Sequence, residues 1–179
     1  ERSERQQAIA QFEDFIKRHP SHARYTPNAL FRLAELYFER SSEEFALRVK
    51  GQTPDGMSTD AGTGVPNYDP SVGLYQRLLR EYPSYRLRDG VHYLLGYCQG
   101  EMGRDAEARQ ALLGLVCANK HKPLDPPSPW PGRKGKAELY QGCQALPGDT
   151  RFLAESWTRI GELHFDRGEL EPAVAAYTQ

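Results

Sequence analysis

Residues 155–177 place their large and small side chains at the spacing of two antiparallel helices joined by a short turn. Residues three and four positions apart share one face of a helix, and a glycine on that face lets a second helix come close. A later glycine suits the turn, because a residue without a Cβ accepts positive φ. The segment therefore predicts a helical hairpin. The residues that set the pattern are, in order, Trp157, Ile160, Gly161, His164, Gly168, Ala173 and Tyr177.

The same pattern occurs 65 residues earlier in the chain, since 160 − 95 = 65 and the other pairs share this interval. A constant interval across several pairs is difficult to obtain by chance, and it predicts a second hairpin over about 89–119. The matched pairs are Leu95 with Ile160, Gly96 with Gly161, Gly103 with Gly168, and Ala108 with Ala173.

Two further helices repeat parts of this pattern near the start of the chain. The stretch FEDFIKRHP at 12–20 shares its spacing with YQRLLREYP at 75–83, since 78 − 75 = 15 − 12 and 83 − 78 = 20 − 15. Between them, Leu30, Leu33, Ala34 and Tyr37 match the first helix of the hairpin in order, and this helix is expected to continue to Val49. Thr26, Asp69 and Asp149 stand where three helices should begin, which predicts that they are N-caps.

This order of large, aliphatic, small, aromatic, small and aromatic residues resembles the tetratricopeptide repeat, with His164 standing where an aromatic residue is usual. The resemblance implies an all-α fold, a right-handed superhelical stack of antiparallel helix hairpins. We expect residues 1–179 to form a single array that is a fragment of a longer chain. Two inserted loops are expected, a flexible one at 51–67, rich in Gly, Thr, Asp and Pro, and a Pro-rich and basic one at 121–149.

Charge and motifs exclude several classes of function. A net charge of -1 and a pI near 6.6 do not suit a nucleic-acid-binding domain, which is usually strongly basic. No apolar run approaches the length needed to cross a bilayer. The cysteines and histidines show neither a CxxC motif nor zinc-ligand spacing, and no nucleophile lies beside a base. We therefore expect no metal, no cofactor and no catalytic residue.

The three cysteines suggest one disulfide. Cys117 ends a predicted helix and Cys143 lies near the end of the following insertion, so a bond between them would fasten that loop at its base. The alternative is two unrelated buried thiols. A disulfide would indicate an oxidising compartment such as the periplasm. Cys98 lies within a helix and is expected in the core. His92 and His164, on the core faces of first helices, are expected to be hydrogen-bonded packing residues.

The resemblance also implies where a partner would bind. First helices of such repeats line a concave groove, and the positions that point into it follow the Trp and Gly positions of each unit. In this sequence the groove is aromatic and acidic, which suits an apolar segment with basic residues or a helix from the same assembly. The Lys and Asn that clamp a C-terminal carboxylate are absent. The alternative is that some of these side chains pack within the chain itself. The positions are Phe31, Glu35, Tyr93, Tyr97, Thr158 and Glu162.

Repeat arrays bind along extended surfaces, so we expect a non-catalytic scaffold with a protein or peptide partner. A proline that closes the second helix, as in REYP, resembles tetratricopeptide proteins of the Gram-negative envelope, of the outer-membrane assembly lipoprotein and Tol-Pal coordinator type. This resemblance implies a periplasmic or envelope location, with the cytoplasm as the alternative. Two other functions stay open at this point. They are a regulatory or substrate-presenting segment of an enzyme whose catalytic domain lies outside this fragment, and cell-wall glycan binding through the aromatic groove residues.

Overall fold

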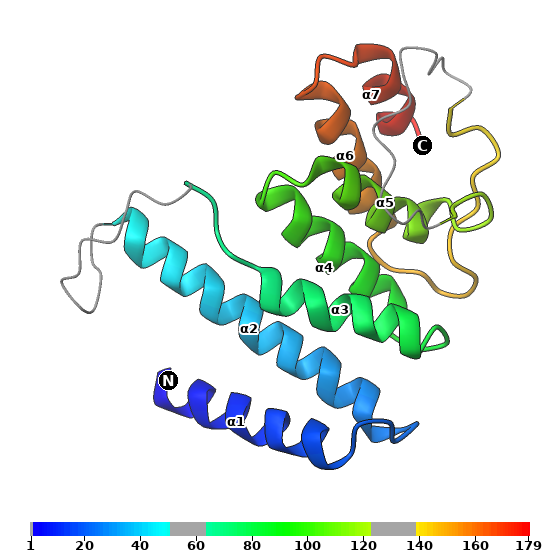
Figure 1. Ribbon diagram of the computed structural model, residues 1–179. Helices are drawn as coiled ribbons and strands as arrows, with labels where there is room; N and C mark the ends of the chain where they lie inside the picture. The colour runs from blue at the N-terminus through cyan, green and yellow to red at the C-terminus, as the bar shows by residue number, and fades with distance from the viewer. Residues whose placement is uncertain (1, 51–63, 123–138) are drawn as a thin grey trace. The chain divides into compact units, whose positions relative to one another are not determined.

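The computed structural model describes residues 2–50, 64–122 and 139–179, and all regular structure in these ranges is helical (Figure 1). Within them the chain forms seven α-helices and no strand. The predicted all-α class is confirmed. Of the two predicted insertions, residues 51–63 and 123–138 lie outside the described residues.

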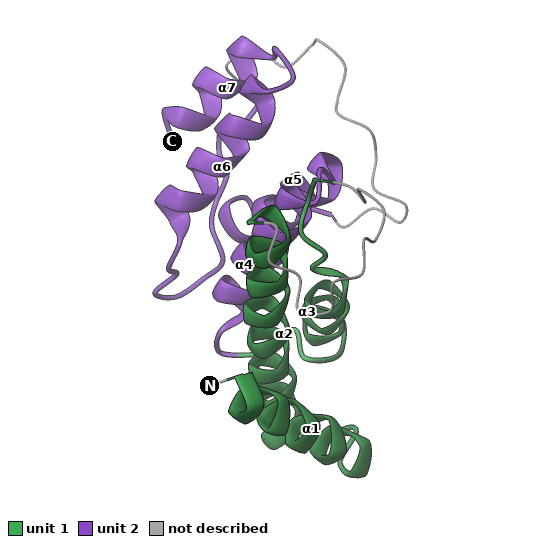
Figure 2. Cartoon of the chain, turned by 90° about the vertical axis from the view of Figure 1, so that its left-hand side faces the viewer, with its two compact units in different colours: residues 1–85 green, residues 86–179 purple. Residues whose placement is uncertain are grey.

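The helices fall into two compact units, residues 1–85 and 86–179 (Figure 2). The first unit contains α1 (Arg2–Arg18), α2 (Tyr25–Val49) and α3 (Asp69–Glu81). The second contains α4 (Arg88–Glu101), α5 (Asp105–Val116), α6 (Leu153–Phe165) and α7 (Leu170–Tyr177). The pairs α4/α5 and α6/α7 are the two predicted hairpins, whereas a single superhelical array over 1–179 stays a prediction.

In the first unit α2 is the central helix, and it packs against both α1 and α3. Ile9 of α1 meets Leu33 and Leu36 of α2 in one apolar cluster. On the other side, the buried Ser71 of α3 donates a hydrogen bond to the carbonyl oxygen of Ala34 at 3.0 Å. The small residue predicted at position 34 therefore lies where a second helix approaches α2.

The three predicted N-caps are wrong by one to three residues. Thr26 lies inside the first turn of α2, where its hydroxyl donates to the carbonyl oxygen of His19 at 2.6 Å and is used to hold the preceding turn. Asp69 lies within α3, and its N–H donates to the side chain of Asn67 at 3.1 Å. Asp149 lies in a bend, and three residues without regular structure separate it from the start of α6. The observed N-cap residues are Arg24, Tyr68 and Phe152, none with a side-chain capping bond.

The second unit packs α5 between α4 and α6, and α7 against α6. Its apolar cluster joins three helices through Leu112 and Leu115 of α5, Ile160 of α6 and Ala176 of α7. Tyr140, which belongs to no helix, is also part of this cluster and is only 2% exposed. The connection between α5 and α6 therefore contributes to the core.

Two glycines permit the close approach of helices within the hairpins, as the sequence pattern predicts. A Cβ on Gly96 would lie 2.6 Å from Cγ of Leu112, and a Cβ on Gly161 would overlap the ring of Tyr177. The turn glycines are also confirmed, since Gly103 and Gly168 both have φ of 73°. An L-residue rarely adopts this conformation, so the two turns select for glycine.

Replacing Gly96 with Ala should lower the free energy of unfolding by about 1–3 kcal/mol, because Leu112 is buried and cannot move away from the added methyl group. Gly100 lies one turn further along α4, and a Cβ there would make only ordinary contacts, the closest at 3.8 Å. The matched variant Gly100→Ala should therefore be neutral or stabilise by up to about 1 kcal/mol. Urea unfolding followed by circular dichroism measures both, and equal effects would contradict the close-approach argument.

Candidate partner-binding site

The two predicted groove residues of the first unit make contacts within that unit. The ring of Phe31 lies 6.3 Å from that of Tyr75 and 6.0 Å from that of Tyr85, so it packs against α3 and the segment that follows it. Glu35 is half-buried and forms a salt bridge with Arg32 at 3.0 Å. For Phe31, the structure therefore matches the alternative of packing within the chain.

In the second unit, Asp89 fixes the start of α6. The residue is 7% exposed. Its carboxylate accepts three hydrogen bonds of 3.0 Å from Arg151, one from the backbone N–H and two from the guanidinium. The N–H of Gly90 donates a fourth at 2.7 Å. Burial raises the pKa of Asp89, but these hydrogen bonds together outweigh it and lower the pKa from 3.8 to about 2. The carboxylate is thus charged and fully engaged.

The residue after Arg151 continues this attachment. Phe152 has φ of 63°, an uncommon conformation for a residue with a side chain, and its ring stacks on Tyr93 of α4 with centroids 4.9 Å apart and planes 5° apart. The stack, together with the Asp89–Arg151 pair, sets how the first turn of α6 meets α4. One face of Tyr93, a predicted groove residue, is covered by this contact.

Arg159 of α6 joins the remaining groove residues of the second unit. Its guanidinium lies over the ring of Tyr97 at 4.6 Å from the centroid, and it forms salt bridges with Glu101 at 2.5 Å and with Glu162 at 3.3 Å. Burial lowers the pKa of Arg159, but the two carboxylates outweigh this effect and raise it. Tyr97 and Glu162 are therefore brought together, whereas Thr158 is exposed and its hydroxyl bonds to the carbonyl oxygen of Ala154.

Beside Arg159 lies a cavity of about 440 Å³ among α4, α5 and α6, called here the acidic pocket. Glycines and apolar side chains form part of its wall, and four carboxylates and one guanidinium lie around it, so negative groups exceed positive ones by 4 − 1 = 3. Glu162 is the predicted groove residue that lines it. The lining residues are Gly96, Gly100, Glu101, Asp105, Leu112, Arg159, Glu162, Leu163, Phe165 and Asp166.

Two of the four carboxylates are not neutralised by a salt bridge. Among the described residues, neither Asp105 nor Asp166 is in a salt bridge, whereas Glu101 and Glu162 share Arg159. Burial raises the pKa of Asp105. The positive charge of Arg167 lowers this pKa, and the negative charges of Asp166 and Glu107 raise it by smaller amounts. Two carboxylates that repel each other across a cavity provide a favourable position for an incoming cation.

Sequence reasoning missed Glu101 and Asp166, although the signal was present. Both lie four residues beyond predicted groove positions, since 97 + 4 = 101 and 162 + 4 = 166. Residues four apart share a helix face, so the groove face extends one turn further than the two positions per helix that the resemblance supplies. Asp105 starts α5, and its place at the pocket depends on how the hairpin closes.

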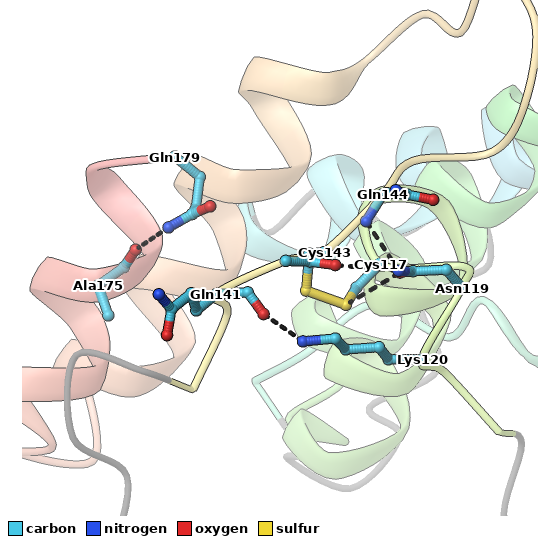
Figure 3. The surroundings of a disulfide bond; sticks show 9 residues. Cys117, Asn119, Lys120, Gln141, Cys143, Gln144, Ala175 and Gln179 are labelled. Carbon is cyan, nitrogen blue, oxygen red and sulfur yellow. Dashed lines mark hydrogen bonds between the residues drawn. A yellow bond between two sulfur atoms is a disulfide. The ribbon is translucent and has the colours of Figure 1, made fainter.

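The predicted disulfide joins Cys117 and Cys143, which are 26 residues apart, and Figure 3 shows its surroundings. The side chain of Asn119 donates to the carbonyl oxygen of Gly142 at 2.9 Å and accepts from the N–H of Gln144 at 2.8 Å. By loop entropy a closure of this length stabilises the folded state by about 3–4 kcal/mol. Cys98 is a free, buried thiol, as expected.

A buried polar network lies next to the disulfide. The hydroxyl of Tyr140 hydrogen-bonds Nε2 of His164 at 2.6 Å, and Nδ1 of His164 bonds the carboxylate of Glu169 at 2.7 Å. Arg109 of α5 also hydrogen-bonds Tyr140. Burial raises the pKa of Tyr140 to about 12 and lowers the pKa of His164 despite Glu169. The phenol is therefore neutral at ordinary pH, and it serves as a packing group whose hydroxyl hydrogen-bonds His164 and Arg109.

The two histidines expected in the core are confirmed. His164 is 1% exposed and belongs to this network, and His92 hydrogen-bonds the carbonyl oxygen of Ala111 at 3.0 Å. Across 2–50, 64–122 and 139–179, no three His, Cys, Asp or Glu side chains are grouped so that they could hold a metal ion. In the same ranges no helix has the length and apolar character of a membrane span.

Comparison with models of known families links part of the chain to one of them. The model of the tetratricopeptide repeat family matches residues 91–116, which cover α4 from its fourth residue and the whole of α5. A search of curated proteins found nothing that matches the chain. The match supports the resemblance seen in the sequence, and repeats of this class typically serve as non-catalytic scaffolds for protein partners.

The stabilisation by Asp89 should disappear in acid. Because its folded pKa, about 2, lies below the ordinary 3.8, the contribution is present above about pH 4 and is lost as pH falls toward 2. At pH 6, Asp89→Asn should lower the free energy of unfolding by about 2 kcal/mol. The difference in this free energy between variant and wild type should shrink as the pH falls toward 2. Thermal unfolding at several pH values measures this. In a protein that already carries Arg151→Gln, Asp89→Asn should lower the free energy of unfolding much less. An equal loss in both backgrounds would contradict the Asp89–Arg151 pair.

Proposed function

We propose that this chain is a protein-interaction scaffold whose second unit binds a segment of a protein partner at the acidic pocket. The partner segment carries a Lys or Arg side chain next to an apolar one. The cation lies between Asp105 and Asp166, and the apolar side chain contacts Leu163 and Phe165. No chemical step is assigned to the chain in this proposal.

The acidic pocket is the observation that carries the proposal. It combines two carboxylates outside any salt bridge with the exposed ring of Phe165, which is 59% exposed. A guanidinium or ammonium group can approach carboxylates and an aromatic face together. The surroundings share the negative potential: burial raises the pKa of Tyr177, and the charges of Glu162 and Asp166 raise it further. Electrostatic complementarity of this kind favours a basic segment.

The positions of the tyrosines favour a protein partner over a glycan. A sugar ring needs an open aromatic face, but Tyr93 stacks on Phe152 and Tyr97 lies under Arg159. The proposed partner contact therefore depends on charge and on Phe165. Tyr93 is assigned to holding α6 in place, and Tyr97 to holding Arg159.

We also propose a location in the bacterial envelope, on the periplasmic side. The disulfide between Cys117 and Cys143 supports this proposal, because such bonds persist in oxidising compartments and are rare in the cytosol of mesophiles. Membership of a larger assembly is part of the same proposal.

Selection from a displayed library of random 16-residue peptides tests the pocket. Wild-type protein should enrich peptides with Lys or Arg beside an apolar residue. The variant Asp105→Asn/Asp166→Asn should bind the enriched peptides about tenfold more weakly, since each partly exposed charge pair contributes up to about 1 kcal/mol. Fluorescence anisotropy of labelled peptides at two salt concentrations measures the affinity, and binding of the wild type should weaken at the higher salt.

A matched control removes the same number of charges elsewhere. Glu155 and Glu171 are exposed on α6 and α7 and do not line the pocket, so Glu155→Gln/Glu171→Gln should bind like the wild type. Enrichment of neutral or acidic peptides, or an equal loss in both double variants, would contradict the proposed site. Unfolding curves of all variants confirm that the fold is intact.

A further inference from the structure

Tyr140 closes the buried face of α6 although it belongs to the connection that precedes this helix. Its ring meets Trp157 edge-on with centroids 5.0 Å apart, and its hydroxyl reaches Nε2 of His164 at 2.6 Å. The side chain lies in the same apolar cluster as Leu112 and Ile160. The burial of Trp157 and His164 on α6 therefore depends on Tyr140, whose side chain comes from a segment outside any helix.

The segment that carries Tyr140, residues 139–146, has neither helix nor strand, and Figure 3 shows part of its attachment to the end of α5. Cys143 is bonded to Cys117 at the end of α5, and the N–H of Leu146 donates to the carbonyl oxygen of Leu115 at 2.9 Å. Asn119 holds Gly142 and Gln144, and the ammonium of Lys120 contacts the carbonyl oxygen of Gln141. The contacts of Asn119 and Lys120 lie on exposed residues, where water competes with them, whereas the Leu115–Leu146 bond joins a buried residue to a half-buried one.

We infer that the Cys117–Cys143 disulfide acts as a redox switch that decides whether Tyr140 stays seated on α6. In the oxidised protein the cross-link holds residues 139–146 at the end of α5, and Tyr140 fills its place beside Trp157 and His164. In the reduced protein this segment detaches and water reaches both residues. The inference does not depend on the proposed partner, because it concerns only α5, α6 and the segment between them.

The chemistry of the switch is thiol–disulfide exchange with a dithiol reductant. A thiolate of the reductant attacks the sulfur of Cys143, which is half-buried, and Cys117, which is 5% exposed, leaves as a thiolate. The second thiol of the reductant then displaces Cys143. The S–S bond of the protein breaks, two protein thiols form after protonation, and the reductant becomes the disulfide.

The disulfide shifts the equilibrium of residues 139–146 toward the state in which Tyr140 packs on α6. The cross-link removes conformational freedom from the detached segment, which without it stays tethered only between α5 and α6. Without it, the attachment of residues 139–146 rests on the packing of Leu139, Tyr140 and Cys143 against the core, on the Leu146–Leu115 hydrogen bond, and on the exposed hydrogen bonds around Asn119. The polar partners of Tyr140, His164 and Arg109, can bond to water instead once the segment has left.

Fluorescence of Trp157 tests the switch directly, because Tyr140 lies against its ring. The chain has two tryptophans, so Trp130, which lies outside the described residues, is replaced by Phe in every sample. On addition of dithiothreitol, we expect the Trp157 emission to shift to longer wavelength and its quenching by acrylamide to increase. Far-UV circular dichroism should stay unchanged, and a maleimide assay should count the two released thiols.

Three variants separate the switch from a general loss of structure. Cys117→Ser/Cys143→Ser should show the reduced emission and no response to dithiothreitol. Tyr140→Ala should show the same emission even when oxidised, whereas Tyr140→Phe keeps the ring and should remain close to the oxidised wild type. Cys98→Ala should respond to reduction like the wild type, which shows that the free thiol plays no part.

Two results would overturn the inference. One is unchanged Trp157 emission and quenching in protein whose two additional thiols react fully, since the segment would then stay seated without the bond. The other is loss of helical signal together with the Trp157 change, because the bond would then maintain the whole unit and would not control one segment.

Discussion

The buried carboxylate of Asp89 holds the connection through which the chain returns from α5 to α6. Three hydrogen bonds from Arg151 and one from the N–H of Gly90 satisfy this charge. A buried charge left without partners would be strongly unfavourable, so the position of Arg151 is closely defined. Since Phe152 follows it and stacks on Tyr93, the register of α6 beside α4 depends on this one carboxylate.

The electrostatics of the acidic pocket follow from that register. Arg159 faces α4 at the height of Tyr97 and Glu101, where one guanidinium is shared between Glu101 and Glu162. Among the residues that line the pocket, this one guanidinium stands against four carboxylates, beside the exposed ring of Phe165, and Arg167 opposes part of the charge at Asp105. In the proposed function, this local imbalance of charge gives the pocket its preference for a basic partner segment, while the helices pack by shape.

The disulfide and the Tyr140 network show that an inserted connection can become part of the core. Tyr140 reaches the face of α6 from a segment without regular structure, and its hydroxyl completes a chain of hydrogen bonds from Arg109 to Glu169. His164, which departs from the aromatic residue usual at its position, is explained by this network. An aromatic ring without a ring nitrogen could not join Tyr140 to Glu169.

The sequence by itself determined the helices and the hairpins, and it suggested the pairing of Cys117 with Cys143 beside the alternative of two unrelated thiols, which the structure decided. The helices and hairpins follow from local spacing: Gly96 and Gly161 lie where helices must approach, and Gly103 and Gly168 lie where φ must be positive. Only the tertiary structure decided that Asp89 meets Arg151, that Phe31 packs inward, and that Asp105 faces Asp166. These contacts join residues up to 62 positions apart, and they depend on the path of a connection whose composition carries no periodicity. Spacing along the chain specifies a helix face, whereas the charges that meet across that face depend on how neighbouring helices are joined and aligned.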